Sequence, residues 1–105
     1  SFECVHRFAG KLSMRETAAV LSTANYFIGP DSLLMHIANG LDTSSTIIFG
    51  GSRPVGCFGY SENTNLSSSP ECSPCWIHEG YESCEHDFNC MSAISVEEVM
   101  ASLIL

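Results

Sequence analysis

The segment Gly29-Pro-Asp-Ser-Leu-Leu-Met-His-Ile-Ala38 carries two side chains that can do chemistry, Asp31 and His36. Its pattern indicates a strand end, a tight turn and a helix start. The N–H groups of Ser32, Leu33 and the next residue would then point out of the carboxyl edge of a sheet, where a helix N-terminus attracts anions. Since a carboxylate repels phosphate, Asp31 is expected to accept hydrogen bonds from sugar hydroxyls. One turn further on, His36 could donate to a phosphate or a hydroxyl.

The spacing alone leaves a second interpretation of this segment open. Asp31 can serve only as the helix N-cap, because short polar side chains accept hydrogen bonds from the first N–H groups of a helix. His36 is then a half-buried helix residue without a ligand.

Four of the six cysteines follow later, as Cys72-Ser-Pro-Cys75 with Cys84 and Cys90. Two thiolates spaced C-x2-C can reach one tetrahedral ion, and a second pair completes a four-thiolate site for zinc or iron. His78 and His86 lie in the same stretch and could replace a cysteine. Two disulfides, or four reduced thiols without metal, are the alternatives. Nothing in the spacing singles out a catalytic Cys/His pair, and the remaining cysteines, at positions 4 and 57, are interpreted as small apolar residues.

Helix and strand signals in the first half position the Asp31 turn. Ser13 followed by Glu16 is a capping-box pattern, which predicts a helix over 14–23. The apolar stretches 25–29 and 45–49 suit buried strands, and Asp31 is predicted to cap a helix that runs to residue 39 and ends at Gly40. A helix between two strands forms a βαβ unit, and its strands are parallel.

The second half shows little periodicity until its end. Residues 51–92 predict a long irregular segment clipped together by cysteines, because an unclipped stretch of that length is uncommon in a compact domain. Ser95 is predicted to cap a C-terminal helix that packs on the core through its face with Val96 and Val99. We expect one domain over 1–105, made of a βαβ core (1–50), a glycine-rich loop with the cysteine knuckle (51–92) and the final helix (93–105).

A formal net charge of −8 disfavours a phosphate-backbone partner, so no nucleic acid is expected. Arg53 is the only cation near a candidate loop. No apolar run approaches the roughly 18 residues that span a bilayer, and the first residues lack the apolar region of a signal peptide. A cytoplasmic protein is therefore expected.

These motifs together resemble a known family. The Gly-Pro-Asp-Ser-x-x-x-His-Ile-Ala turn, preceded by Gly10-Lys-Leu-Ser13 and followed by Ile-Ile-Phe-Gly-Gly-Ser52, looks like the C-terminal, donor-binding domain of heptosyltransferase-like glycosyltransferases, which is family 9 of the GT-B type. Cys90-Met91, followed by Ile94-Ser-Val-Glu-Glu-Val99, is similar to a subgroup with a C-terminal cysteine metal knuckle. The resemblance covers about residues 8–103.

The resemblance implies an α/β fold, namely the C-terminal half of a GT-B enzyme with a partial Rossmann-like parallel sheet and flanking helices. It implies a nucleotide-sugar donor, such as ADP-heptose, held by one set of donor-binding residues. Asp31 would contact the sugar, His36 would lie beside the sugar or the phosphate, and the backbone around the turn and the glycine-rich loop would hold the diphosphate. The donor-binding set is Asp31, Ser32, Leu33, His36, Gly51 and Ser52. Leu33 departs from the family pattern, which usually has the smaller glycine there.

The functional expectation is a donor-binding part of a sugar-nucleotide-dependent glycosyltransferase. It is expected to be inactive alone, because the resemblance places the acceptor pocket and the general base upstream. The alternative is a metal-stabilised structural or protein-interaction module without catalytic activity. Two strands leave sheet edges unpaired, so a homo-oligomer is also expected.

Overall fold

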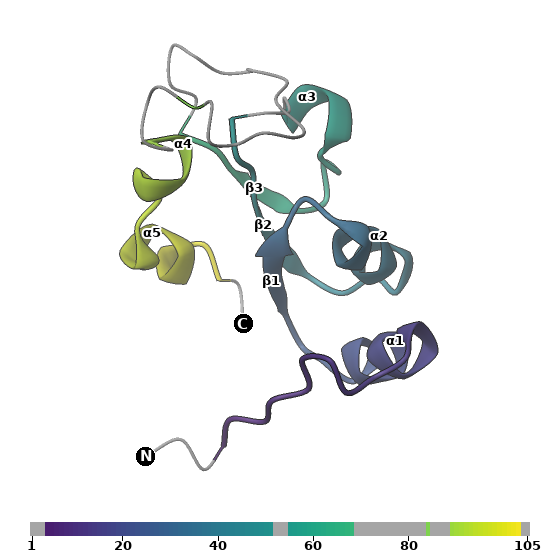
Figure 1. The fold of residues 1–105 in the computed structure, drawn as a ribbon. Coiled ribbons are helices and arrows are strands. Elements are labelled where there is room, and N and C mark those ends of the chain that lie inside the picture. The colour runs from purple at the N-terminus through teal and green to yellow at the C-terminus, as the bar shows by residue number, and fades with distance from the viewer. Residues whose placement is uncertain (1–3, 52–54, 69–83, 85–88, 104–105) are drawn as a thin grey trace.

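A computed structural model describes residues 4–51, 55–68, 84 and 89–103 of the chain. These residues form a three-stranded sheet with helices on both of its faces (Figure 1). The elements follow in the order α1 (Met14–Ser22), β1 (Phe27–Pro30), α2 (Leu33–Gly40), β2 (Ser45–Ile48), α3 (Val55–Phe58), β3 (Thr64–Leu66), α4 (Asn89–Ser92) and α5 (Val96–Ala101). The architecture confirms the predicted α/β class and its partial Rossmann-like character.

The strands lie in the order β1-β2-β3 and are all parallel. Phe27 is opposite Ser45 and Pro30 is opposite Ile48, so the predicted βαβ unit is present with α2 as its crossover helix. The third strand was missed, because its segment was predicted to be irregular. Thr64–Leu66 contains only three residues and becomes a strand by pairing with β2.

The predicted capping box begins α1 as expected. Ser13 Oγ accepts a hydrogen bond from the Glu16 N–H at 3.1 Å, and Glu16 Oε1 accepts one from the Ser13 N–H at 2.9 Å. Two of the donors that a helix start leaves unsatisfied are thereby satisfied. The helix ends one residue earlier than predicted, and Thr23 is its C-cap.

Helix α2 ends close to the predicted position, but Gly40 is its last residue and not the residue that terminates it. Gly40 is still helical, and the left-handed residue after the helix is Asp42, with a φ of 57°. The Thr43 N–H donates to the Ala38 carbonyl at 2.9 Å, and the Asp42 N–H donates to the Asn39 carbonyl at 3.1 Å. These two bonds form a Schellman motif, which satisfies the last carbonyls of the helix without glycine.

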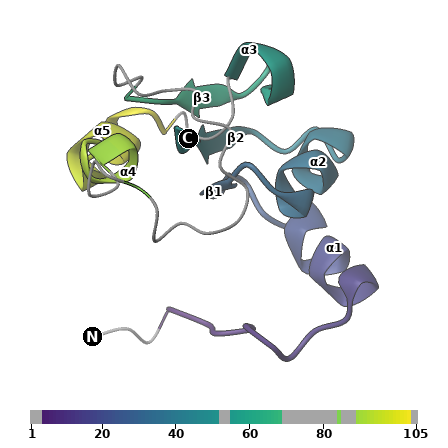
Figure 2. The ribbon, with the colours of Figure 1, turned by 45° about the horizontal axis from the view of Figure 1, so that its top comes forward.

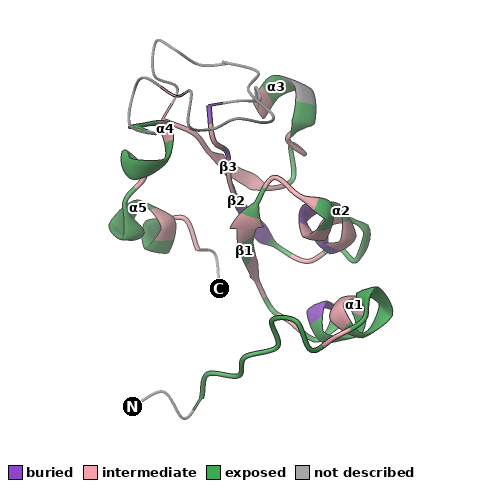
Figure 3. Ribbon diagram, viewed as in Figure 1, coloured by how far each residue is buried: buried purple, intermediate pink, exposed green. Residues whose placement is uncertain are grey.

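The core lies between α2 and the sheet. Met35, Ile47 and Phe49 form a fully buried cluster, against which Phe27, Val55 and Tyr60 pack. The buried positions in Figure 3 accordingly gather where α2 faces β2. Side chains alternate between the two faces of a strand, so Thr46 points to the face opposite Ile47.

On that opposite face, α5 meets the sheet through hydrogen bonds. Thr46 Oγ1 lies 2.9 Å from the Oγ of Ser102, the C-cap of α5, and 2.8 Å from the Tyr26 hydroxyl. Ser95 caps α5 as predicted, with its Oγ 3.0 Å from the Glu98 nitrogen. The predicted core-packing face was only partly correct, because Val96 remains 74% exposed. Figure 2 shows α4 and α5 on the side of the sheet away from α1 and α2.

Candidate functional site

The turn that carries Asp31 and Ser32 joins the carboxyl end of β1 to the start of α2. Both residues are half-buried. Ser32 has extended backbone angles (φ −157°, ψ −177°) and is the N-cap of α2, whereas Asp31 was predicted to be the cap. The chain stays extended for one residue longer than the motif indicated, and the helix starts correspondingly later.

The Ser32 side chain makes no capping hydrogen bond, although its type favours one. The Met35 N–H donates to the Ser32 carbonyl at 3.1 Å, which closes the first turn. The N–H groups of Leu33 and Leu34 have no acceptor within the helix, as is general for the first residues of a helix. This helix end therefore presents backbone donors and a positive partial charge next to Asp31.

The second predicted strand end lies beside this turn. Because Pro30 is opposite Ile48 in a parallel register, the residues that follow β1 and β2 leave the sheet at the same edge. Gly51 follows β2 and is buried. Ser52, the last predicted donor-binding residue, lies outside the described residues, as does Arg53. Topology thus brings Asp31, Ser32 and Gly51 to one edge of the sheet.

Leu33 is the first residue of α2 and is 53% exposed. A large apolar side chain therefore stands in solvent beside the N–H groups that would meet a phosphate. A glycine at this position would let a ligand approach the backbone more closely.

His36 lies on α2 one turn after Ser32 and is exposed. Its Nδ1 is 2.7 Å from the Tyr60 hydroxyl, and the two rings meet edge to face with centroids 5.5 Å apart. Tyr60 was not among the predicted site residues, because no local motif marks it. It reaches His36 from a loop 24 positions away along the chain.

The proposed metal ligands fall only partly within the described residues. Cys84 and Cys90 are half-buried free thiols, whereas Cys72 and Cys75 lie outside the described residues, as do the alternative ligands His78 and His86. In the described part of the chain, no three His, Cys, Asp or Glu side chains form a group able to hold a metal ion. The four-thiolate site therefore stays a prediction.

Cys90 nevertheless lies near the candidate edge. The Ser68 hydroxyl, two residues after β3, donates to the Cys90 carbonyl at 2.9 Å. A Cβ atom placed on Gly50 would lie 3.2 Å from the sulfur of Met91. The Cys90-Met91 pair in α4 thus lies close to the carboxyl ends of β2 and β3.

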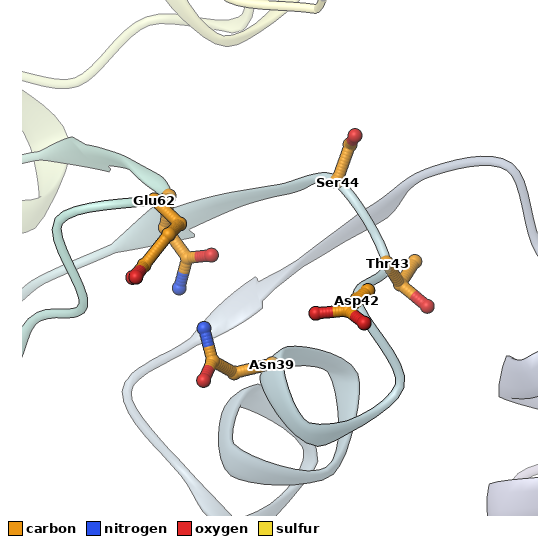
Figure 4. A pocket seen from close by; sticks show the side chains of 6 residues that line it. Asn39, Asp42, Thr43, Ser44 and Glu62 are labelled. Atoms are coloured by element: carbon orange, nitrogen blue, oxygen red, sulfur yellow. The ribbon is translucent and has the colours of Figure 1, made fainter.

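Two pockets formed by described residues lie away from the candidate edge. A polar pocket of about 190 Å³ lies at the amino ends of β2 and β3, and Figure 4 shows the Asp42 and Glu62 carboxylates among its lining groups. An apolar pocket of about 530 Å³ lies among the N-terminal segment, α1, β1 and α2. Neither pocket contains a predicted donor-binding residue.

The sheet and its edge define an α/β protein of Rossmann-like type, with a helix start and a glycine loop side by side at the carboxyl ends of two parallel strands. Proteins of this kind bind ligands at that edge. The family model of glycosyltransferase family 9 (heptosyltransferase) matches residues 2–85, and the chain belongs to this family. A search of curated proteins and a search of solved structures each found no match. No helix in the described ranges is long and apolar enough to cross a membrane.

Proposed function

We propose that this chain is the donor-binding part of a sugar-nucleotide-dependent glycosyltransferase. The observation that carries the proposal is the start of α2 beside Asp31, next to the end of β2, in a chain of family 9. The donor's diphosphate would accept hydrogen bonds from the N–H groups at Ser32 and Leu33, supported by the helix dipole. Asp31 would accept hydrogen bonds from sugar hydroxyls, because its charge repels phosphate.

The glycine-rich loop completes the proposed donor site from the neighbouring strand. Gly51 and Ser52 would approach the diphosphate from β2, and His36 would meet a phosphate or sugar oxygen from α2. A nucleoside diphosphate sugar such as ADP-heptose is the proposed ligand. A GT-B enzyme holds its acceptor in a separate domain, so we propose that these 105 residues bind the donor without transferring the sugar. We also propose that the chain acts in the cytoplasm, where cysteine thiols stay reduced.

The exposed Leu33 favours a second candidate, a metal-stabilised structural or interaction module that retains the fold without donor binding. A leucine side chain at the helix start occupies space that glycine would leave open to an approaching phosphate. The two candidates make opposite predictions for nucleotide binding.

Isothermal titration of the purified chain with ADP, UDP, ADP-heptose and a UDP-sugar distinguishes the two candidates. Donor binding predicts heat with at least one nucleotide sugar and a roughly tenfold loss of affinity in Asp31→Ala, the scale of one hydrogen bond to a charged group. Ser44→Ala, an exposed serine at the opposite edge of the sheet, is the matched control and should bind as the unmodified chain does. The absence of heat with every ligand would favour the interaction module.

Leu33→Gly refines the same titration. Removing the side chain opens the backbone at the helix start, so donor affinity should rise, and Leu33→Ala should give a smaller rise. Glycine also destabilises a helix by roughly 1 kcal/mol relative to alanine, so affinities are compared well below the unfolding temperature of each variant. Equal affinities in all three proteins would show that Leu33 does not limit access.

A further inference from the structure

The contact between His36 and Tyr60 is a direct side-chain link between α2 and the loop after α3. The Tyr60 hydroxyl lies 2.7 Å from His36 Nδ1, and the planes of the rings meet at 82°. An edge-to-face arrangement of aromatic rings is favourable in itself, and it restricts the ring orientation of His36. Of the two imidazole nitrogens of His36, Nδ1 is therefore the one that is hydrogen-bonded to Tyr60.

The structure holds Tyr60 in place from several sides. Its carbonyl accepts hydrogen bonds from Asn65 Nδ2 at 2.9 Å and from the Asn63 N–H at 3.1 Å, and its ring packs on the buried Met35–Ile47–Phe49 cluster. The preceding Gly59 sits so close to its neighbours that an added Cβ would lie 3.0 Å from the Val55 carbonyl oxygen. Tyr60 is thus a fixed partner, while His36 is exposed to solvent.

The chemistry of the two groups determines the consequence. A tyrosine hydroxyl can donate to the unprotonated nitrogen of a neutral imidazole, and the other nitrogen then carries the hydrogen. When the Tyr60 hydroxyl donates to Nδ1, Nε2–H is the group left to meet a ligand. His36 then acts toward a ligand as a hydrogen-bond donor, which suits the oxygen of a phosphate or sugar.

We propose that Tyr60 is a positioning residue for His36: it donates its hydroxyl hydrogen to Nδ1 and holds the neutral ring with its hydrogen on Nε2. The ligand-facing part of this inference rests on the proposed donor binding, in which an oxygen of the nucleotide sugar accepts the Nε2–H. The tautomer itself can be tested without any ligand.

Long-range ¹H–¹⁵N NMR of the full chain, labelled with ¹⁵N-histidine and recorded at about pH 8.5, reports the tautomer directly. His36→Gln identifies the His36 signals among those of the four histidines. We expect a hydrogen on Nε2 and an unprotonated, hydrogen-bonded Nδ1, and a clear shift of the Nδ1 resonance in Tyr60→Phe. A hydrogen on Nδ1, or unchanged signals in Tyr60→Phe, would overturn the proposal.

Tyr26→Phe is the matched control. It removes a tyrosine hydroxyl that bonds to Thr46 on the opposite face of the sheet, so it should lower stability and leave the His36 signals in place. In titrations with the nucleotide sugar that binds the unmodified chain, Tyr60→Phe should weaken affinity roughly tenfold. Unchanged affinity would overturn the role of Tyr60 in binding. If the unmodified chain binds no nucleotide sugar, the proposed function fails, whereas the tautomer measurement still decides the Tyr60–His36 relationship.

Discussion

Thr46 Oγ1, fully buried in the central strand, shares a 2.9 Å hydrogen bond with the Oγ of Ser102 at the C-terminal cap of α5. The same hydroxyl lies 2.8 Å from the Tyr26 hydroxyl, which in turn donates to the Ser102 carbonyl at 3.3 Å. Tyr26, which directly precedes β1, thus forms one polar network with Thr46 of β2 and Ser102, the C-cap of α5. This network attaches the C-terminal helix to the sheet.

Thr46→Val should lower the free energy of unfolding by about 1–3 kcal/mol, because it keeps the side-chain shape and removes one hydrogen bond from each of the half-buried Tyr26 and Ser102 hydroxyls. Ser102→Ala should have a smaller effect. Urea unfolding of both single variants and the double variant measures their coupling, which should be about 1 kcal/mol for groups in direct contact. Strictly additive effects would show that the hydrogen bond does not stabilise the docking of α5.

The hydrogen-bonded Glu16 carboxylate should make the chain less stable as the pH falls into the acid range. Its hydrogen bonds, first to the Ser13 backbone and then to the Ser13 side chain, lower the pKa of its carboxyl below the ordinary 4.5. A depressed folded-state pKa gives stabilisation that is complete above the unfolded value and is lost as the pH falls through the folded value. Stability measured from pH 7 to pH 3 should therefore fall less steeply in Glu16→Gln than in the unmodified chain.

Ser13→Ala tests the other half of the capping box. The change should cost about 0.5–2 kcal/mol at neutral pH, as expected for an N-cap serine. Ser22→Ala serves as the control, because Ser22 is an exposed residue in the last turn of the same helix. Equal losses in the two variants would contradict a specific capping role for Ser13.

At the end of α2, removing one glycine and introducing another should both stabilise the chain. Gly40 is helical, and a Cβ there would meet nothing within 4 Å, so Gly40→Ala should raise the free energy of unfolding by roughly 1 kcal/mol. Asp42 has a φ of 57°, so Asp42→Gly should also stabilise and Asp42→Ala should destabilise, each by about 1 kcal/mol. Thermal and urea unfolding provide the measurements. If Gly40→Ala destabilised the chain, Gly40 would be the left-handed terminator that the sequence indicated.

The cysteine knuckle predicts bound metal. Elemental analysis of the purified chain should give about one zinc or iron atom per chain, and Cys72→Ser or Cys75→Ser should reduce it well below that. Chelation should lower the unfolding temperature, because binding energy at a structural site contributes to folding. Cys4→Ser, at an exposed thiol, should change neither quantity. A metal-free protein with four free thiols would contradict the prediction.

Self-association is the remaining prediction. Within the described residues, β1 pairs with β2 on one side only, and Ile28 on this edge strand is 44% exposed. Unpaired edges with exposed apolar side chains favour pairing with another chain. Light scattering at micromolar concentration should give at least a dimer mass, which Ile28→Lys should reduce and Val96→Lys, on α5, should not. A monomeric mass for the unmodified chain would refute the prediction.

Local chemistry made much of this protein predictable from its sequence. Ser13 and Glu16 are three residues apart, so the capping box depends on nothing beyond its own turn. Ile47, Ile48 and Phe49 form a continuous apolar run, as is typical of a strand that is buried on both faces. The Asp31–His36 segment and its flanking motifs predicted the family, and the family match to residues 2–85 confirms this prediction.

Long-range contacts decided the rest. The three residues of β3 carry no signal of their own and become a strand because β2 supplies the pairing groups. The bond between Tyr60 and His36 joins positions 24 residues apart, and no local spacing encodes it. The sequence therefore determined the elements and the motif, since these depend on neighbouring residues, whereas only the tertiary structure decided which distant side chain holds His36.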